Sequence, residues 1–322
     1  MFRALPALLA LLCFAPLAGR AQDAYPSRQV RLIMPFPPGS STDIVARVMA
    51  DQLSRKWGQN VFVDNVVGAT GNIGAADVFR AAPDGYTLLF SPPTSFATNH
   101  FLFKNIGYDP SKWSPLGLVS TVPYMLAARP DFPGSTVKDL IDYARKNPDK
   151  TTFASAGAGS TIQLAAVELG RRAGVHFVHV PFRGAAPALT AVLAGQVDFL
   201  FDVISTSIPA WKDNKLKALG VGSPEPSEFM PGVATIAAQG YPGFRAVTWF
   251  AIAGPPGMAP ALVDKINADI RAILALPDVA ARIRGIQMKP TPASPADTRK
   301  WFDDEAGLWG GIIAAAGIKA EE

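Results

Sequence analysis

Short apolar runs alternate with helical patterns along most of this chain. The alternation begins with an apolar run at residues 30–34, followed by a helical pattern at residues 43–57. A strand followed by a helix, many times over, is typical of an α/β fold. Loops rich in glycine, serine or proline follow most of the apolar runs, as the short connections of such a fold require.

This pattern predicts the positions of the individual elements. Strands are expected at residues 30–34, 61–64, 87–91, 116–119, 124–128, 152–154, 175–180, 199–202, 218–221 and 249–253. Helices are expected where apolar residues recur every three or four positions, at residues 43–57, 74–81, 137–147, 160–174, 185–194, 204–213, 260–275 and 295–316.

The length of the chain, 322 residues, exceeds what one hydrophobic core usually fills, so we expect two lobes. Two segments rich in proline and glycine, residues 129–136 and 240–244, are the predicted crossings. They divide the chain into a first lobe of residues 22–128 plus 244–322 and an inserted second lobe of residues 129–243. Two crossings predict a hinged pair of lobes around a cleft.

Residues 1–21 predict a cleaved secretory signal. Arg3 precedes an apolar run that is shorter than the roughly 20 residues needed to span a bilayer, and Gly19-Arg20-Ala21 closes it with small residues. The one cysteine of the chain, Cys13, lies in this segment. We therefore expect an exported mature chain without disulfides, thiolate metal sites or a cysteine nucleophile.

Charge and motifs argue against nucleic-acid binding and against catalysis. The 30 basic and 26 acidic residues are scattered without a basic cluster. No metal-ligand spacing links His100, His176 and His179, and no serine lies in a Gly-x-Ser-x-Gly frame. Gly-x-Gly-x-x-Gly and Gly-Lys-Ser/Thr loops are also absent. The sequence thus predicts no cofactor, no metal and no enzyme.

The loop at residues 35–43, Pro-Phe-Pro-Pro-Gly-Ser-Ser-Thr-Asp, joins a predicted strand to a predicted helix. Free backbone amides at a helix start attract anions, Gly39 allows close approach, and Ser40 and Ser41 add uncharged donors. The alternative is simple capping of the helix, by Ser41 or Asp43.

Similar loops follow at residues 68–74, 155–161 and 179–188, and each feeds a helix. Asp202 ends an apolar strand, where it accepts hydrogen bonds either from its own loop or from a polar ligand. The aromatic residues Phe36, Phe96, Trp249 and Phe250 lie beside these loops. They either line a cleft or pack in the core.

Several motifs in order resemble the Bug-type substrate-binding proteins of tripartite tricarboxylate transporters. They are YPSRQVRLIMPFPPGSSTDIVAR, GATGNIGAADVFRAAPDGYTLLF, ASAGAGST, HVPFRGAAPAL, LAGQVDFLFD, KLKALGV and WFAIAGPPGMAP, and they span nearly the whole mature chain. The resemblance implies a two-lobed Venus-flytrap of the type II periplasmic-binding-protein fold. It also implies a small carboxylate held between the lobes by loop amides, hydroxyls and water.

Matching positions imply a set of ligand-binding residues: Phe36, Gly39, Ser40, Ser41, Asp43, Gly71, Asn72, Ser95, Ala158, Gly159, Ser160, Thr161, Gly184, Ala185, Pro187 and Asp202. The chain departs from the common family pattern at Val66-Val67, where Arg-Pro is usual, and at Thr70, Gln163 and Val203, where Gly, His and Asn are usual. These departures bear on the choice of ligand.

The resemblance implies a monomeric periplasmic receptor that delivers its ligand to a large and a small membrane subunit of an importer. A sensor that presents the bound ligand to a signalling receptor has the same sequence features, and an enzyme is the least favoured alternative. Aliphatic di- and tricarboxylates, amino acids and aromatic carboxylates are all compatible with the family. Phe36, Phe96 and Phe250 favour a ligand with an apolar or aromatic body.

Overall fold

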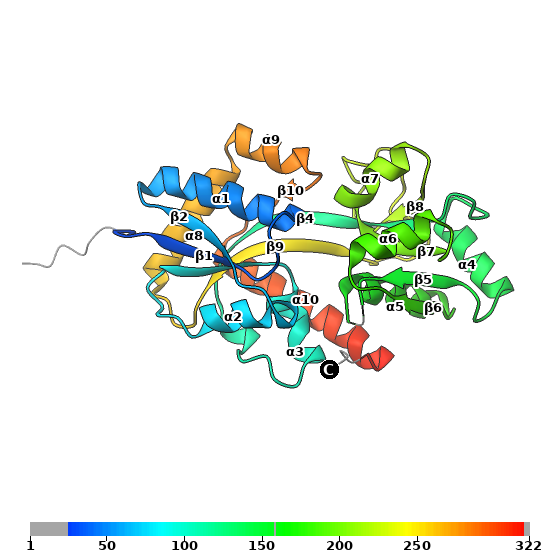
Figure 1. The fold of residues 1–322 in the computed structure, drawn as a ribbon, viewed down its shortest axis with the longest axis horizontal. Coiled ribbons are helices and arrows are strands. Elements are labelled where there is room, and N and C mark those ends of the chain that lie inside the picture. The colour runs from blue at the N-terminus through cyan, green and yellow to red at the C-terminus, as the bar shows by residue number, and fades with distance from the viewer. Residues whose placement is uncertain (1–24, 158, 319–322) are drawn as a thin grey trace, which may run out of the picture.

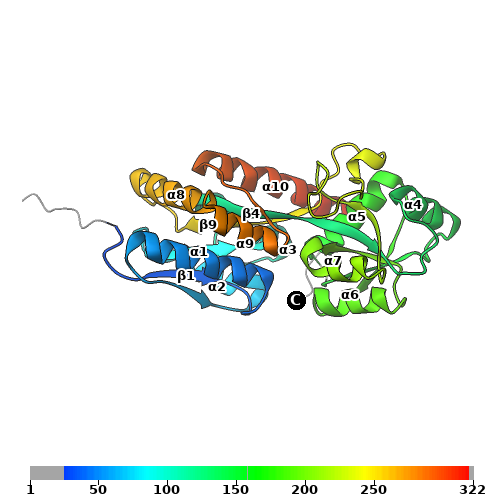
Figure 2. The same ribbon diagram turned by 90° about the horizontal axis from the view of Figure 1, so that it is seen from above.

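The computed structural model describes residues 25–157 and 159–318. The predicted signal segment and Ala158 lie outside the described residues. Strands follow the order β2-β1-β3-β9-β4-β7-β5-β6 in one continuous sheet, and β8 and β10 also pair with β4. Helices cover both faces of this sheet (Figures 1 and 2). The α/β prediction is therefore confirmed.

One part of the sheet and its helices form lobe 1. Its strands are β1 (Val30–Met34), β2 (Val61–Asn65), β3 (Thr87–Ser91), β9 (Val247–Gly254) and β10 (Lys289–Pro290). Its helices are α1 (Ser41–Trp57), α2 (Asn72–Phe79), α3 (Asn99–Leu102), α8 (Pro260–Leu274), α9 (Pro277–Gly285) and α10 (Pro295–Ala316), with short turns η1 (Ala69–Gly71), η2 (Thr94–Thr98) and η3 (Pro110–Lys112).

The other part forms lobe 2. Its strands are β5 (Thr152–Ser155), β6 (Val178–Pro181), β7 (Phe199–Val203) and β8 (Lys217–Val221). Its helices are α4 (Val137–Lys146), α5 (Thr161–Ala173), α6 (Ala185–Leu193) and α7 (Ile204–Lys212), with the turn η4 (Ala237–Gln239). The order of these helices and strands of lobe 2 is the one that the apolar pattern predicts, with shifts at their ends.

Strand β4 (Ser114–Ala128) belongs to both lobes. Up to Pro123 it pairs with β9 and β10, and from Tyr124 onward it pairs with β7 and β8. The two strands predicted at residues 116–119 and 124–128 are thus one. β4 and β9 run side by side between the lobes in Figure 1. The pairing changes ahead of the predicted boundary at residue 129.

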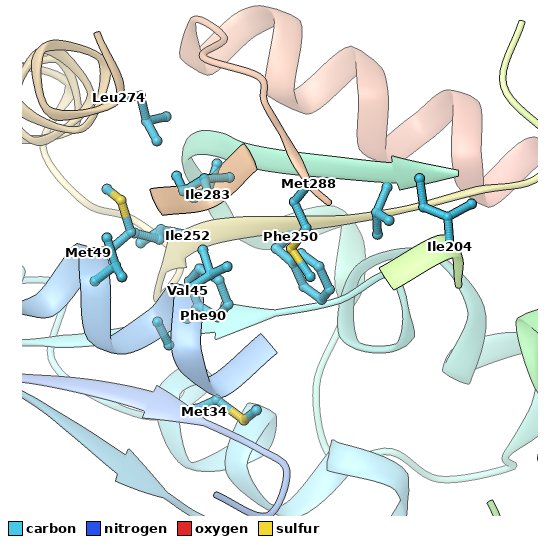
Figure 3. Packing of buried hydrophobic residues seen from close by; sticks show 14 of the residues in the cluster. Met34, Val45, Met49, Phe90, Ile204, Phe250, Ile252, Leu274, Ile283 and Met288 are labelled. Atoms are coloured by element: carbon cyan, nitrogen blue, oxygen red, sulfur yellow. The ribbon is translucent and has the colours of Figure 1, made fainter. Parts of the chain in front are cut away.

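A continuous apolar core crosses from one lobe to the other on one face of the sheet. In lobe 1 it includes Met34, Phe90 and Phe250, and in lobe 2 it includes Ile204. Figure 3 shows Phe250 and Met288 on the side of the core that extends toward Ile204. The opposite face has a separate core in each lobe.

The last helix, α10, connects the lobes a third time. Glu305, near its middle, accepts hydrogen bonds from the indole nitrogens of Trp249 and Trp309, each at 2.9 Å. Beyond that point Trp309, Ile312 and Ile313 pack with Leu164 of α5 in a small buried cluster. The helix therefore begins on lobe 1 and ends against lobe 2 (Figure 1).

Three elements were not predicted: α3, α9 and β10. The strand predicted at residues 175–180 is also too long, because β6 begins at Val178. His176 was expected on a buried strand, but its side chain is 74% exposed and contacts Asp149. The apolar residues Val175 and Phe177 that caused this error lie in a loop that packs under the lobe 2 core.

Candidate functional site

Apart from Ala158, which lies outside the described residues, the predicted ligand-binding residues lie at or just after the carboxyl ends of six strands, β1, β2, β3, β5, β6 and β7. In lobe 1, β1 is parallel to both β2 and β3, and in lobe 2, β5 is parallel to both β6 and β7. Loops that follow parallel strands leave from one edge of a sheet, where α/β proteins bind ligands. The two groups of loops approach each other, since a Cβ atom on Gly159 would lie 2.8 Å from Cδ1 of Leu102 in lobe 1.

The β1–α1 loop is organised by its own side chains. Ser40 is the cap of α1, and its hydroxyl accepts from the amide of Asp43 at 3.2 Å. The cap was predicted one to three residues later, at Ser41 or Asp43. Gly39 has a φ of 90°, a left-handed conformation that suits glycine. The amide of Gly39 donates to the Asp43 carboxylate at 3.0 Å.

Asp43 is 3% exposed and its two oxygens are fully engaged within lobe 1. They accept from Arg47 at 2.8 and 3.1 Å, from the Asn65 side chain at 3.1 Å, and from Gly39. Burial raises the pKa of the Asp43 carboxyl, but the donors Arg47, Gly39 and Asn65 outweigh burial and bring the pKa below its ordinary value. Asp43 thus holds the loop in shape as a permanent anion.

The β2–α2 loop has an unusual backbone. Gly68, Ala69, Thr70 and Gly71 all have positive φ, at 140°, 46°, 53° and 89°. Gly71 lies against the Phe36 ring, because a Cβ atom there would approach Phe36 to 3.2 Å. No side chain caps the start of α2. The amide of Asn72 donates to the Ala69 carbonyl, and the amides of the next residues have no partner within the helix.

Asn72, the first residue of α2, is part of a buried polar cluster. Its side-chain oxygen accepts from Asn99 at 2.7 Å and from the hydroxyl of Tyr108 at 2.9 Å. Ser95 is fully buried nearby, and its hydroxyl is 2.7 Å from that of Ser91. The ligand-binding role predicted for Ser95 therefore competes with an existing internal hydrogen bond.

In lobe 2, hydrogen bonds from side chains at the start of α5 hold the β5–α5 loop in place. Ser160 caps α5, its hydroxyl accepting from the Gln163 amide at 3.4 Å and donating to the Gly157 carbonyl at 2.7 Å. The Gly159 amide donates to the Gln163 side chain at 2.7 Å. The hydroxyls of Thr161 and Tyr124 lie 2.5 Å apart, and burial raises the pKa of Tyr124 to about 12.

The β6–α6 loop is less closely packed than the β5–α5 loop. Gly184 stands before α6 with a φ of 119°, and no side chain caps the helix. A Cβ atom at Gly184 would find only Pro187 within 4 Å. Ala185 is half-buried and Pro187 is exposed. The first amides of α6 are thus free to meet an anion.

Asp202, at the end of β7, is fully buried. Its Oδ2 accepts from two hydroxyls, that of Thr206 at 2.5 Å and that of Ser207. Its Oδ1 has no hydrogen-bond partner among the described residues. Burial raises the pKa of Asp202 against the effect of those donors. Both hydroxyls belong to helix α7, so these internal hydrogen bonds of Asp202 come from helix side chains, and its contact with a ligand stays a prediction.

Three aromatic residues predicted beside the cleft belong instead to the core. Phe96, Trp249 and Phe250 are 1%, 0% and 4% exposed. Phe96 stacks on Phe302 with ring centres 4.4 Å apart, and Phe250 stacks on Phe90 at 6.0 Å. Of the two alternatives that the sequence leaves open, these three residues adopt core packing. Of the four aromatic residues considered, only Phe36 is half-buried at the loops.

Sequence reasoning missed the residues that support the loops from beneath: Asn65, Asn99, Tyr108, Tyr124, Gln163 and His179. His179 lies 2.6 Å from the Ser155 hydroxyl and 3.2 Å from the Gln163 amide nitrogen. The available signal was a family departure at Gln163, which marks the position without identifying its partners. The partners come from other strands and helices, so spacing along the chain does not reveal them.

Two further observations concern residues 25–157 and 159–318. No group of three or more histidine, cysteine, aspartate or glutamate side chains is arranged to hold a metal ion. No helix among these residues is long and apolar enough to cross a membrane.

Comparison with known proteins decides the family. The model for the "Tripartite tricarboxylate transporter family receptor", TctC, matches residues 45–318. The chain belongs to this family. A curated relative from Pseudomonas sp. strain P51, the UPF0065 protein in the tcbD-tcbE intergenic region, is 35% identical over 94% of this chain and 91% of its own length. The Bug-type resemblance is thus confirmed.

Solved structures of other proteins agree with the fold. A protein of R. palustris with adipate is 32% identical, with a TM-score of 0.81 over 92% of this chain and 100% of that chain. The periplasmic binding protein BugD is 34% identical, with a TM-score of 0.76 over 92% and 100%. MatC from Rhodopseudomonas palustris with bound malate is 31% identical, with a TM-score of 0.75 over 90% and 100%. This TctC-family chain is therefore a binding protein of the periplasmic type and not an enzyme.

Proposed function

We propose that this TctC-type receptor captures a small carboxylate between lobe 1 and lobe 2. The observation that carries the proposal is the pair of uncapped helix starts, α2 in lobe 1 and α6 in lobe 2, at the loop edges of the two parallel sheets. Such amides bind anions without a charged partner. Relatives solved with adipate and with malate support the same ligand class.

Within that class, an aliphatic dicarboxylate fits better than an aromatic carboxylate. Phe96 and Phe250, which would have to stack on a ring, are occupied in the core. Two half-buried aromatic residues lie at the loops, Phe36 in lobe 1 and Phe182 in lobe 2, and Phe182 packs against the apolar core. Two anion-binding helix starts on opposite lobes suit a ligand with a carboxylate at each end. Adipate and malate both have this form.

Capture is proposed to proceed by rotation of the lobes about β4 and β9, with lobe boundaries near residues 129 and 243. The loaded form then delivers its ligand to the large and small membrane subunits of a tripartite tricarboxylate-type importer, with the receptor acting as a monomer. The family description supports this partner. Residues 1–21 would direct export to the periplasm and would then be cleaved.

A thermal-shift screen tests the ligand class. The protein is unfolded and refolded to remove bound ligand, and is then heated with adipate, malate, citrate, glutamate, nicotinate or terephthalate. A ligand at a hundred times its Kd stabilises a fold by about 2.7 kcal/mol, which raises Tm by several degrees. We expect the largest rise with an aliphatic dicarboxylate. A rise with aromatic acids alone would contradict the ligand choice, and no rise with any acid would contradict carboxylate capture.

A further inference from the structure

We propose that Asn99 and Tyr108 are positioning residues that orient the Asn72 side chain with its amino group toward the ligand carboxylate. This inference rests on the proposed function, because it specifies how lobe 1 recognises the anion. It adds two residues that neither touch the ligand nor belong to the binding loops identified from sequence.

The orientation of the Asn72 carboxamide follows from its neighbours. Its oxygen accepts two hydrogen bonds, from the Asn99 amide at 2.7 Å and from the Tyr108 hydroxyl at 2.9 Å. A carbonyl oxygen has two lone pairs, so both are used. Rotating the amide by 180° would place its N–H groups against the N–H group of Asn99, which has no lone pair to accept a hydrogen bond. The nitrogen therefore takes the other side, where it donates to none of the described residues.

Asn99 is itself held in one orientation. Its amide nitrogen donates to Asn72 and also to the Thr70 carbonyl at 3.1 Å, so both of its N–H groups are engaged. Asn99 is 1% exposed, and its oxygen is buried without a partner. The reversed amide would bring that oxygen against two other oxygens. Asn99 therefore keeps an orientation in which its oxygen is unsatisfied and both of its N–H groups donate.

The bond from Asn99 to Thr70 also stabilises the loop backbone. Ala69 and Thr70 have left-handed φ values of 46° and 53°, which are uncommon for residues with a side chain. Strain of this kind persists only where the surroundings fix it, and it is concentrated at functional sites. Asn99 therefore links the strained turn to the side chain that follows it.

Tyr108 provides a rigid donor. Its ring packs against Trp113 and Phe79, with ring centres 5.6 and 6.2 Å away. Burial raises the pKa of the Tyr108 hydroxyl well above its ordinary value, so the hydroxyl stays protonated at every physiological pH. A permanently protonated hydroxyl keeps the Asn72 oxygen occupied.

The Asn72 side chain is therefore a neutral group with two N–H donors at the first position of α2. Its N–H groups lie beside the uncapped amides of that helix, where the helix dipole favours negative charge. A carboxylate accepts from such a set, whereas a primary amide or ester of the same acid offers one acceptor oxygen in place of two. Lobe 1 is therefore selective for the ionised acid.

The first test is Tyr108→Phe, which removes one donor and leaves the ring. We expect its Kd for the dicarboxylate that wild type binds, adipate or malate, to rise about three- to tenfold, as for the loss of one hydrogen bond. Tyr143→Phe in lobe 2 is the matched control, and its Kd should not change. Isothermal titration measures Kd, and Tm without ligand verifies the fold of each variant.

The second test is Asn72→Asp, which replaces the donor by a charge. At pH 7 the Kd should rise by more than about a hundredfold, because two carboxylates face each other. As pH falls from 7 to 5 the ratio of variant to wild-type Kd should decrease, since a protonated Asp donates again. A merely structural role for Asn72 would give a ratio independent of pH.

The outcomes separate the two proposals. If wild type binds adipate or malate and Tyr108→Phe binds equally well, or if the Asn72→Asp ratio does not change with pH, the positioning role is wrong and the proposed function stands. If wild type binds no carboxylate in the panel, the proposed function fails and the positioning role fails with it.

Discussion

Asp43 shows how a single residue shapes the first binding loop. It joins the loop, helix α1 and strand β2 through Gly39, Arg47 and Asn65. Its carboxylate accepts and does not donate, so it repels an anionic ligand rather than binding it. We therefore interpret Asp43 as support for Gly39, and its predicted direct contact with ligand stays untested.

Replacing Asp43 by Asn should lower the free energy of unfolding at pH 7 by about 1–3 kcal/mol, because charge-assisted hydrogen bonds are lost from a buried position. The folded pKa of Asp43 is below its unfolded value, so the wild-type advantage is fully present above the unfolded pKa. It is lost as pH falls through the folded pKa. Urea unfolding between pH 7 and pH 2.5 measures this difference.

Asp51→Asn is the matched control for this change. Asp51 lies on the same helix and pairs with Arg55, but both side chains are exposed. An exposed pair contributes little to stability, so the control should change the unfolding free energy by less than about 0.5 kcal/mol. An equal loss in both variants, or a loss at Asp43 that does not depend on pH, would contradict the assigned role.

At the scale of residues, the positions of the loops can be predicted from the sequence more reliably than the role of each side chain in them. Glycine and serine after an apolar run mark a strand-to-helix turn from local physics alone. Asn65 and Asn99 are distant in sequence from Phe36 and Thr70, and only folding brings them together. Thr70, where the family usually has glycine, adopts a left-handed backbone because Asn99 holds its carbonyl.

At the scale of elements, α10 is the feature that sequence pattern describes least. Its bounds were predicted correctly, Pro295–Ala316, yet its contacts with both lobes were not. Apolar periodicity identifies a buried face and does not say which element covers it. β4 was divided in prediction for a related reason. Polar Ser120 and Thr121 interrupt its apolar run, and Pro123 lies where its partners change.

The contact between α10 and α5 predicts a coupling between the lobes. Leu164→Ala removes the fully buried α5 side chain from the cluster with Trp309 and Ile313, at a cost of about 2–5 kcal/mol if the site does not collapse. Amide hydrogen exchange should then increase in the last two turns of α10 and not in its first two turns.

Leu169→Ala provides the comparison for that experiment. Leu169 is also buried on α5, but it packs in the core of lobe 2 with Phe153 and Phe199. Leu169→Ala should increase amide hydrogen exchange in the strands of lobe 2. In α10 it should not increase exchange more in the last two turns than in the first two turns. Similar exchange in α10 for both variants would mean that the cluster does not couple the lobes.

At the scale of the whole molecule, fold class and family follow from sequence because they depend on many weak signals in order. Each apolar run or glycine loop is weakly informative, and their succession over the chain is specific. The position of the lobe boundary is harder to predict from sequence. Strand β4 passes from lobe 1 into lobe 2, and only its pairing partners change along the way. Composition marks the proline-rich segments near it and not the residue where the pairing partners change.

Shared strands predict that the lobes rotate rather than separate. Saturating adipate or malate, whichever wild type binds, should lower the radius of gyration measured by small-angle X-ray scattering. Asn72→Asp at the same ligand concentration and pH 7 should keep the ligand-free value. An unchanged radius for saturated wild type would contradict capture by closure.

The position of β9 has a consequence for how the chain acquires its structure. β9 lies between β3 and β4 in the sheet, but it follows all of lobe 2 in the chain. A chain that ends before Val247 therefore leaves β3 and β4 with open edges, which favour aggregation. Lobe 2 draws its strands from one contiguous stretch and needs only shorter-range pairing. Lobe 2 should thus fold first, and the lobe that begins the chain should be the last to be completed.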